Sequence, residues 1–357
     1  MFDSYARINK LLAGGMPDRA PLFDLIRNDR IIEYFGGGKM TPENTEAFIY
    51  KTVREALDAT RSAVDEPRPI TIPLDKETEY IKDGRRRIIR RWTTWAEHRK
   101  YSDAEDYIKS KRDYIREHEK WSMEDEKKLG DFLKAQQCAE EAIKGTFLFW
   151  ETPANLWLEG IFEEVGLEQF SYYLTDCYDV IIEQLEFNLQ KGLQRLDHLP
   201  AKVNIPAAFY ADDIAYKSGP LFSPDFLNKE YFPRMKKIID QLHARGNKVM
   251  FHSDGNLNLV LETLVGTGID ILNPIEVLAD MKIIEIHRRF PKLLMAGGID
   301  VSQLLPFGKP EEVRDAVTKA IEEAEGKIMI GSTTELHAEV SLDNFLAMRD
   351  TVLKYSY

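Results

Sequence analysis

His252 and Asp254 are the residues whose types and spacing best suit chemistry in this sequence. They come at the end of a short apolar run, 248–252, and are followed at once by Gly255 and Asn256. In an extended segment, side chains two residues apart point the same way, so both could reach one ligand. An apolar run that breaks into small polar residues is typical of a buried parallel strand that delivers polar side chains at its C-terminal end, where the chain turns back. The alternative is a core histidine beside an Asp that holds the following loop, because a lone His-x-Asp pair is a weak motif.

Other polar residues follow apolar runs in the same manner. Asp212 and Asp213 are adjacent carboxylates, which repel each other and are seldom placed together without a use. We expect the catalytic residues among Asp213, Glu151 and Asp212, since such groups suit general acid–base chemistry, a metal, or both. Three further residues are candidate substrate contacts, although the first also precedes a proline as a turn signal and the last could be a loop residue: Asn273, Tyr210 and His337.

Short apolar runs alternate with amphipathic segments along most of the chain. We expect strands at 18–26, 62–65, 146–150, 202–210, 248–252, 269–273, 293–300 and 327–333. Helices are expected at 41–59, 170–192, 226–245, 257–265, 281–290, 310–325 and 342–355. This alternation predicts an α/β fold, a (β/α)8 TIM barrel whose active-site groups lie at the C-terminal strand ends. A doubly wound sheet is the alternative, but no GxGxxG or GxxxxGKS follows any strand.

Residues 67–145 differ in character from the rest of the chain. A β-hairpin or meander is expected over 70–94, with its turn at 83–84, and a charged helical stretch over 104–144. We interpret 67–145 as an insertion within a single domain of residues 1–357. It would cap the barrel mouth or contact a partner or a second subunit. Its cluster of arginines is interpreted either as a phosphate or carboxylate clamp or as a solvated strand edge: Arg85, Arg86, Arg87, Arg90 and Arg91.

Composition limits the classes of partner and compartment. The 357 residues carry a net charge of −12 without a basic tail, which argues against a nucleic-acid or anionic-membrane partner. Cys138 and Cys177 form no CxxC pair, so a disulfide framework or a Cys-rich zinc site is excluded. The N-terminus has no apolar segment typical of a signal peptide, and no apolar run approaches ~20 residues. We expect a soluble, cytoplasmic protein, and a homodimer is compatible with the sequence.

Several ordered motifs together resemble the uroporphyrinogen decarboxylase superfamily. The segment 251–256, Phe-His-Ser-Asp-Gly-Asn, is similar to the HSxGN segment of that superfamily. Further similar stretches occur in the same order at 211–213 with 218–224, 297–300, 308–313, and 331–333 through 340–344. The resemblance is weak over 17–60 and good over 146–357. Two departures distinguish the chain from the true decarboxylase: the Arg-rich RQAGRY motif is missing near 19–30, and Thr334 stands where that enzyme has a His.

The resemblance is closer to the branch of corrinoid-dependent methyltransferases, in its O-demethylase-like form. Thiol-activating members bind zinc through HxC and a later Cys. In this sequence His252 matches the His, Asp254 stands at the first Cys position, and Ser332 is near the second. Because zinc accepts carboxylate oxygen as well as thiolate, the resemblance implies zinc ligands His252, Asp254 and Glu335. Such a site is better suited to polarising an oxygen or nitrogen leaving group than to activating a thiol.

The expected function is therefore transfer of a methyl group from a small methoxylated or methylated-amine compound to a corrinoid (cobalamin) carried by a partner protein. Two alternatives remain open. One is a metal-independent decarboxylase or lyase acting on a smaller acid through Asp213. The other is a non-catalytic protein that binds a corrinoid or another tetrapyrrole.

Overall fold

Eight parallel strand segments form a closed ring in the computed structural model, which describes residues 3–61, 76–82, 84–201, 203 and 205–355. Six strands pair in the order β13-β12-β11-β10-β7-β6. Their bounds are β6 Trp150–Glu151, β7 Ala207–Ala211, β10 Lys248–His252, β11 Ile271–Ile275, β12 Leu294–Ile299 and β13 Ile328–Ser332. β5 (Phe147–Leu148) ends one residue before β6, so the two form one segment of the ring, and β5 pairs with β1 (Ala59–Thr60). The ring closes through an N-terminal segment whose Phe23 bridges to Ala59 and whose Leu22 bridges to Ile330. The expected (β/α)8 barrel is confirmed.

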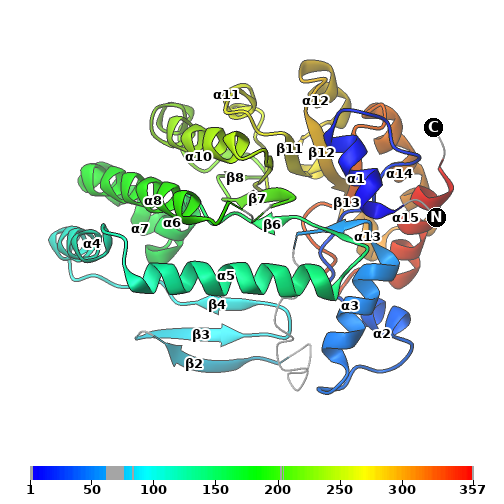
Figure 1. Ribbon diagram of the computed structural model, residues 1–357, viewed down its shortest axis with the longest axis horizontal. Coiled ribbons are helices and arrows are strands. Elements are labelled where there is room, and N and C mark those ends of the chain that lie inside the picture. The colour runs from blue at the N-terminus through cyan, green and yellow to red at the C-terminus, as the bar shows by residue number, and fades with distance from the viewer. Residues whose placement is uncertain (1–2, 62–75, 83, 202, 204, 356–357) are drawn as a thin grey trace.

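Helices follow the strands and cover the outside of the ring (Figure 1). Those of the barrel are α2 Asp29–Gly36, α3 Thr45–Ala56, α6 Leu158–Val165, α7 Leu167–Asp176, α8 Tyr178–His198, α9 Pro224–Phe226, the π-helix η1 Leu227–Tyr231, α10 Phe232–Ala244, α11 Leu261–Gly266, the 3-10 helix η2 Val277–Ala279, α12 Ile283–Arg289, α13 Leu304–Phe307, α14 Pro310–Glu323 and α15 Leu342–Lys354. Within the described residues, no helix combines the length and the apolar character needed to cross a membrane.

The alternation of side chains along each strand produces two separate apolar cores. Phe23, Phe149, Phe209 and Met250 belong to the cluster inside the barrel. Their neighbours in sequence, such as Trp150, Tyr210 and Phe251, belong to the larger cluster between the strands and the helices. Since successive side chains of a strand point to opposite faces, this pattern fixes which strand residues can reach the barrel mouth.

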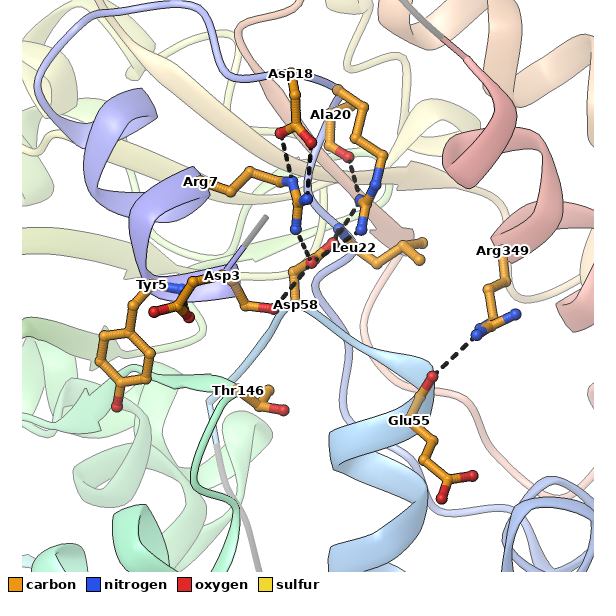
Figure 2. A network of polar contacts seen from close by, with 12 residues as sticks. Asp3, Tyr5, Arg7, Asp18, Ala20, Leu22, Glu55, Asp58, Thr146 and Arg349 are labelled. Atoms are coloured by element: carbon orange, nitrogen blue, oxygen red, sulfur yellow. Dashed lines mark hydrogen bonds and ion pairs between the residues drawn. The ribbon is translucent and has the colours of Figure 1, made fainter. Parts of the chain in front are cut away.

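Helix α1 (Ser4–Leu12) closes the bottom of the barrel, because its Ile8 and Leu11 join the interior cluster. A buried polar network fixes this helix (Figure 2). Asp58, just before β1, accepts hydrogen bonds from Arg7 Nη1 at 2.5 Å and from Arg19 Nη1 at 2.6 Å. It also accepts one from the backbone N–H of Leu22 at 2.8 Å. One carboxylate therefore joins α1, the first strand segment and the start of the second.

A second group of elements lies beside the barrel rather than within it. The antiparallel sheet β2 (Thr78–Lys82), β3 (Arg85–Ile89) and β4 (Thr94–Ala96) is followed by α4 (Ala104–His118) and α5 (Met123–Ala142). Figure 1 shows α5 running between this sheet and the barrel. Ser122 begins α5 through a capping box with Asp125, as expected for a polar residue three positions before an acidic one. A hairpin, β8 (Ala215–Tyr216) and β9 (Gly219–Pro220), follows the strand β7.

One expected element differs from the structure, and two others lie outside the described residues. The second strand was expected at 62–65, which lies outside the described residues, and the described strand is β1 at Ala59–Thr60. The expected strand at 70–72 also lies outside them. The helix expected over 170–192 is two helices, because Cys177 has non-helical backbone angles and separates α7 from α8.

Candidate functional site

His252 is the last residue of β10 and points into the mouth of the barrel. Met250, two residues earlier, belongs to the interior cluster, whereas Phe251 between them faces the helices. His252 is buried, and its ring centroid lies 5.3 Å from that of Phe209 on the neighbouring strand. The alternation of the strand therefore explains why this histidine faces the inside of the barrel.

Asn273 determines which nitrogen of the His252 ring is available. Its Oδ1 lies 2.6 Å from His252 Nδ1, while its Nδ2 donates to the Ala296 carbonyl at 3.5 Å. The amide oxygen must therefore accept from an N–H at Nδ1, which leaves the lone pair on Nε2. Burial, followed by the charge of Arg61, lowers the pKa of His252 to about 3, so the ring is neutral. A neutral imidazole with one nitrogen held by an amide oxygen is the arrangement found in metal ligands.

Asp254 lies opposite the free nitrogen, with its Oδ1 3.8 Å from His252 Nε2. Among the described residues, this Oδ1 is shielded from solvent and has no hydrogen-bond partner. Burial raises the pKa of Asp254 to about 7, and the charges of Asp213 and Glu276 contribute in the same direction. A buried carboxylate oxygen without a partner is costly, which indicates a position for a bound cation or a shared proton.

The loop after His252 needs a glycine to place Asp254. Gly255 has φ +93°, and a Cβ there would lie 2.8 Å from the backbone nitrogen of Tyr216. Its N–H donates to Glu276 Oε2 at 2.7 Å. The N–H of Asp254 donates to Asp213 Oδ1 at 2.9 Å. The loops after β7, β10 and β11 are thus joined at one point.

Asp213, His252 and Asp254 together form a candidate metal centre. Each offers one ligand atom, and these atoms all lie within 4.8 Å of one another. One imidazole nitrogen and two carboxylate oxygens are acceptable donors for zinc, and the unpartnered Asp254 Oδ1 is consistent with an ion at this place. The donor set therefore fits the expected metal.

Glu335 was expected as the third ligand, but it makes a different contact. Its Oε2 lies 2.7 Å from Arg27 Nη1 and 3.8 Å from Arg61 Nη2. Asp213 is the carboxylate that joins His252 and Asp254 instead. Ser332, which stands near the second Cys position of the zinc-binding methyltransferases, donates a hydrogen bond from its Oγ to Asp24 Oδ1 at 2.7 Å.

Arg61 is a site residue that was not identified from the sequence. Its guanidinium carbon lies 5.1 Å from the centroid of the Phe209 ring, inside the barrel mouth. Its charge opposes the burial effect that raises the pKa of Asp24, Asp213 and Asp254. Arg61 directly follows β1, so a correct position for the second strand would have placed it at a strand end.

Asp212 and Asp213 point in different directions and have different surroundings. Asp212 is buried, and it accepts from the backbone N–H groups of Leu158 at 3.0 Å and Glu159 at 2.7 Å, and from Tyr231 Oη at 2.9 Å. It therefore caps the N-terminus of α6 from a neighbouring strand end. Only Asp213 of the pair joins His252.

The remaining predicted residues lie at several places around the mouth. Tyr210 is buried on the helix side of β7, where its Oη accepts from Leu156 N at 3.0 Å. His337 lies in the loop after β13, and its Nε2 is 3.0 Å from the carbonyl oxygen of Val301, which follows β12. Glu151, at the end of β6, lines a cavity of about 460 Å³ between the strand ends and α5. Of these three residues, only Glu151 faces an open space.

Glu159 was also missed by the sequence analysis. It lines the same cavity as Glu151, and its Oε2 accepts from the backbone N–H of Asp213 at 3.3 Å. Burial raises the pKa of Glu159 to about 8, and the charges of Asp213 and Asp212 add to this effect. Glu159 lies in the first turn of α6, not at a strand end, so no strand pattern could have identified it.

A family model for uroporphyrinogen decarboxylase (URO-D) matches residues 207–355, which contain β7, His252 and the strands through β13. This part of the chain is therefore similar to the uroporphyrinogen decarboxylase family. The URO-D match covers the segments on which the resemblance was based, including the His252 motif and the region around 331–344. A search of curated proteins gave no match.

The chain is similar to solved structures at low sequence identity. A methyltransferase from Methanosarcina mazei is 13% identical over 99% of each chain, with a TM-score of 0.67. A B12-independent methionine synthase from Shewanella sp. W3-18-1, solved with selenomethionine, is 11% identical over 94% of this chain and 98% of that one, with a TM-score of 0.47. The first likeness shows that this chain shares the fold of that methyltransferase over nearly its whole length.

Proposed function

We propose that this protein is a methyltransferase of the URO-D superfamily that moves a methyl group from a small methoxylated or methylated-amine compound to a corrinoid protein. The observation that carries the proposal is the group of Asp213, His252 and Asp254 at the barrel mouth, in which His252 is buried and the two carboxylates are half-buried. The Methanosarcina mazei methyltransferase shares the overall fold, which supports the same general reaction class.

In this proposal Asp213, His252 and Asp254 hold zinc, with Asp213 replacing the expected Glu335. Zinc bound there would supply Lewis acidity to the oxygen or nitrogen from which the methyl group departs. Asn273 keeps His252 in the tautomer that presents Nε2. Arg61 offsets the negative charge of the carboxylates around the mouth.

The proposed substrate space is the cavity of about 460 Å³, which is linked to this group through Glu159, a lining residue that contacts the Asp213 backbone. Trp157, Phe132 and Leu129 give it apolar walls, and Glu151 and Glu159 bring carboxylates to it. A cavity of this size, lined mainly by apolar groups with a few polar ones, suits a small organic molecule. Glu159 contacts the backbone of Asp213, so it can accept or return a proton beside the proposed metal ligands.

The segment 67–145 is proposed as an insertion that caps one side of the mouth. Helix α5 supplies Leu129 and Phe132 to the substrate cavity, opposite the strand-end residues Glu151 and Ala211. If a chain lacking this segment still folded and retained unchanged substrate binding, corrinoid-protein binding and oligomeric state, the assignment as a cap or contact would be wrong.

A metal-independent decarboxylase or lyase is the second candidate. The pKa of Asp254 is raised to about 7, mainly by burial, so this carboxyl group can exchange a proton near neutral pH without a metal. Asp213 accepts the Asp254 N–H and would share that role, while Arg61 would bind the acid group of the substrate. A non-catalytic corrinoid or tetrapyrrole binder is the third candidate.

The deciding experiment combines metal analysis with turnover. Wild type, His252→Ala and Asp254→Ala are reconstituted with zinc, and His337→Ala serves as a matched histidine control. Each is assayed for methyl transfer to cob(I)alamin from methoxylated and methylated-amine donors. The proposal is supported if His252→Ala and Asp254→Ala lose both stoichiometric zinc and activity, while His337→Ala keeps both. A metal-free wild type with full activity would remove zinc from the mechanism and favour Asp213 acid–base chemistry.

A further inference from the structure

The arginine cluster of β3 is divided between two faces of its sheet. Arg86 points outward, where it pairs with Glu79 and with Glu97 at 3.0 Å. Arg85 and Arg87 flank it in sequence and therefore lie on the opposite face. Both line a cavity of about 620 Å³ that separates this sheet from helix α6.

The other arginines of the cluster have carboxylate partners away from this cavity. Arg90 lies 3.2 Å from Glu77, and Arg91 pairs with Asp29 at the start of α2. Surface ion pairing accounts for Arg86 and Arg90, which are exposed, although β3 is the central strand of its sheet and the expected strand edge is therefore wrong. It does not account for Arg85 and Arg87.

The two inward arginines are oriented for a ligand. Arg85 donates its Nε to the Glu97 carbonyl at 2.8 Å, which fixes the plane of the guanidinium and leaves its two terminal nitrogens directed elsewhere. Arg87 Nε is shielded from solvent and has no hydrogen-bond partner among the described residues. A shielded guanidinium N–H without an acceptor is costly, so an acceptor supplied by a ligand would stabilise it.

The other ionisable residues of the cavity are His98, Glu163 and Glu164. His98 lies at its edge, with Nδ1 2.9 Å from the Glu163 carbonyl oxygen. Glu164 is already engaged by Lys111 and by Arg99, whose Nε lies 3.4 Å away. Glu163 is the other acidic residue of the wall, and burial raises its pKa.

Helix α6 connects this cavity to the candidate metal centre. Glu159 and Glu163 are one turn apart on α6, so they share a face of the helix. Glu159 contacts the Asp213 backbone, and the charge of Asp213 also reaches Glu163. The charges of His98 and Arg85 act on Glu163 in the opposite sense. One turn of α6 therefore links this cavity to Asp213 of the candidate metal centre.

We propose that Arg85 and Arg87, facing α6 across the cavity of about 620 Å³, form a binding site for an anionic group, a carboxylate or a phosphate. The planar guanidinium forms paired hydrogen bonds with either group, which favours Arg over Lys at such a position. The site stands on its own contacts and does not depend on methyl transfer. A carboxylated small molecule and a phosphate-bearing ligand are the two sources of such a group.

The test uses isothermal titration of the whole protein with benzoate, inorganic phosphate and neutral benzamide at low salt. The double variant Arg85→Gln/Arg87→Gln is compared with Arg86→Gln/Arg90→Gln, which removes the same charge from the same strand region. We expect saturable binding of benzoate or phosphate to wild type, weakened about tenfold or more only in the first variant, and no comparable binding of benzamide. The anion that binds more tightly shows whether the natural ligand carries a carboxylate or a phosphate.

A second measurement does not depend on the folding of the variants. Phenylglyoxal modification of wild type is mapped by mass spectrometry with and without the bound anion. Protection of Arg85 and Arg87, but not of Arg86, supports the site. Equal weakening in both double variants, no saturable binding, or equal labelling of all three arginines would overturn it.

Discussion

Asn273 Oδ1 accepts the N–H of His252 Nδ1 at 2.6 Å and thereby fixes the nitrogen that His252 offers to the barrel mouth. The two residues are partners across β10 and β11, and both side chains face the barrel interior. Asn273 was expected to contact substrate. Its hydrogen bond also makes Asn273 a residue that orients a candidate metal ligand.

Asn273→Ala is expected to lower zinc affinity about 10- to 100-fold without removing any proposed ligand, which is the usual effect of losing such a supporting hydrogen bond. Chelator competition after zinc reconstitution measures this change. Asn258→Ala is the control, because Asn258 lies in the turn before α11 and donates to the Asp280 carbonyl at 3.0 Å, away from His252. Unchanged affinity in Asn273→Ala would show that the tautomer of His252 is fixed by other means.

Zinc binding is expected to weaken as the pH falls through about 7. Burial raises the pKa of Asp254 to about 7, so this carboxyl group is protonated below that pH and ionised above it. Zinc requires the ionised form, and one competing proton reduces affinity about tenfold per pH unit below the pKa. Chelator competition between pH 8 and 5.5 measures the profile. A flat profile would contradict the prediction.

The stability of the metal-free protein should change with pH in the opposite sense. The folded-state pKa of Asp254 lies above its unfolded value of about 3.9. Protonated Asp254 therefore contributes fully to the free energy of unfolding below about pH 3.9, and this stabilisation is lost as the pH rises through about 7. Saturating zinc should offset this loss. Urea unfolding at pH 5 and 8, with and without zinc, compares the two effects.

The barrel could be predicted from sequence because its strands are apolar runs that end in small polar residues. The strand β10 with His252 was found in this way, and the interior position of that residue follows from the two-residue alternation. The second strand was misplaced because β1 has only two residues, too few for any periodic signal. That error hid Arg61, which directly follows β1.

Contacts made between loops could not be predicted by the same reasoning. Asp212 and Asp213 were indistinguishable in sequence, and only the position of α6 shows that Asp212 caps this helix. Glu335 lies in a loop after β13, where no alternation determines its direction, and Arg27 is its partner. Glu159 reaches Asp213 from a helix.

Gly331→Ala is expected to prevent normal closure of the barrel. A Cβ at this position would lie 1.8 Å from the Phe23 carbonyl oxygen, where the first strand segment meets β13. Relief requires a backbone shift, so we expect a loss of about 3 kcal/mol or more in the free energy of unfolding. Urea unfolding measures it.

Gly130→Ala is the matched control for that substitution. Gly130 lies within α5, and a Cβ there would meet nothing within 4 Å. Alanine in a helix interior is expected to stabilise by about 0.5–1 kcal/mol. Similar effects of the two substitutions would show that the approach of Phe23 to Gly331 does not limit stability.

Asp58→Ala is expected to destabilise the closed bottom of the barrel. Asp58 is 3% exposed and faces two arginines, Arg7 at 2.5 Å and Arg19 at 2.6 Å (Figure 2). Removing the shared carboxylate leaves buried cations without their partner, a change that costs about 3–5 kcal/mol. Urea unfolding followed by circular dichroism measures the loss.

Asp18→Asn is the control for that prediction, because it removes the other carboxylate partner of Arg7. Asp18 lies 2.8 Å from Arg7 Nε, but its side chain is 31% exposed, so water can replace part of the lost interaction. We therefore expect a loss of about 1 kcal/mol or less, as for pairs near the surface. The difference between the two variants isolates what burial adds at Asp58. If both variants lost the same stability, the anchoring of α1 would depend on Arg7 and Asp18, and Asp58 would not be the residue that joins the helix to the first two strands.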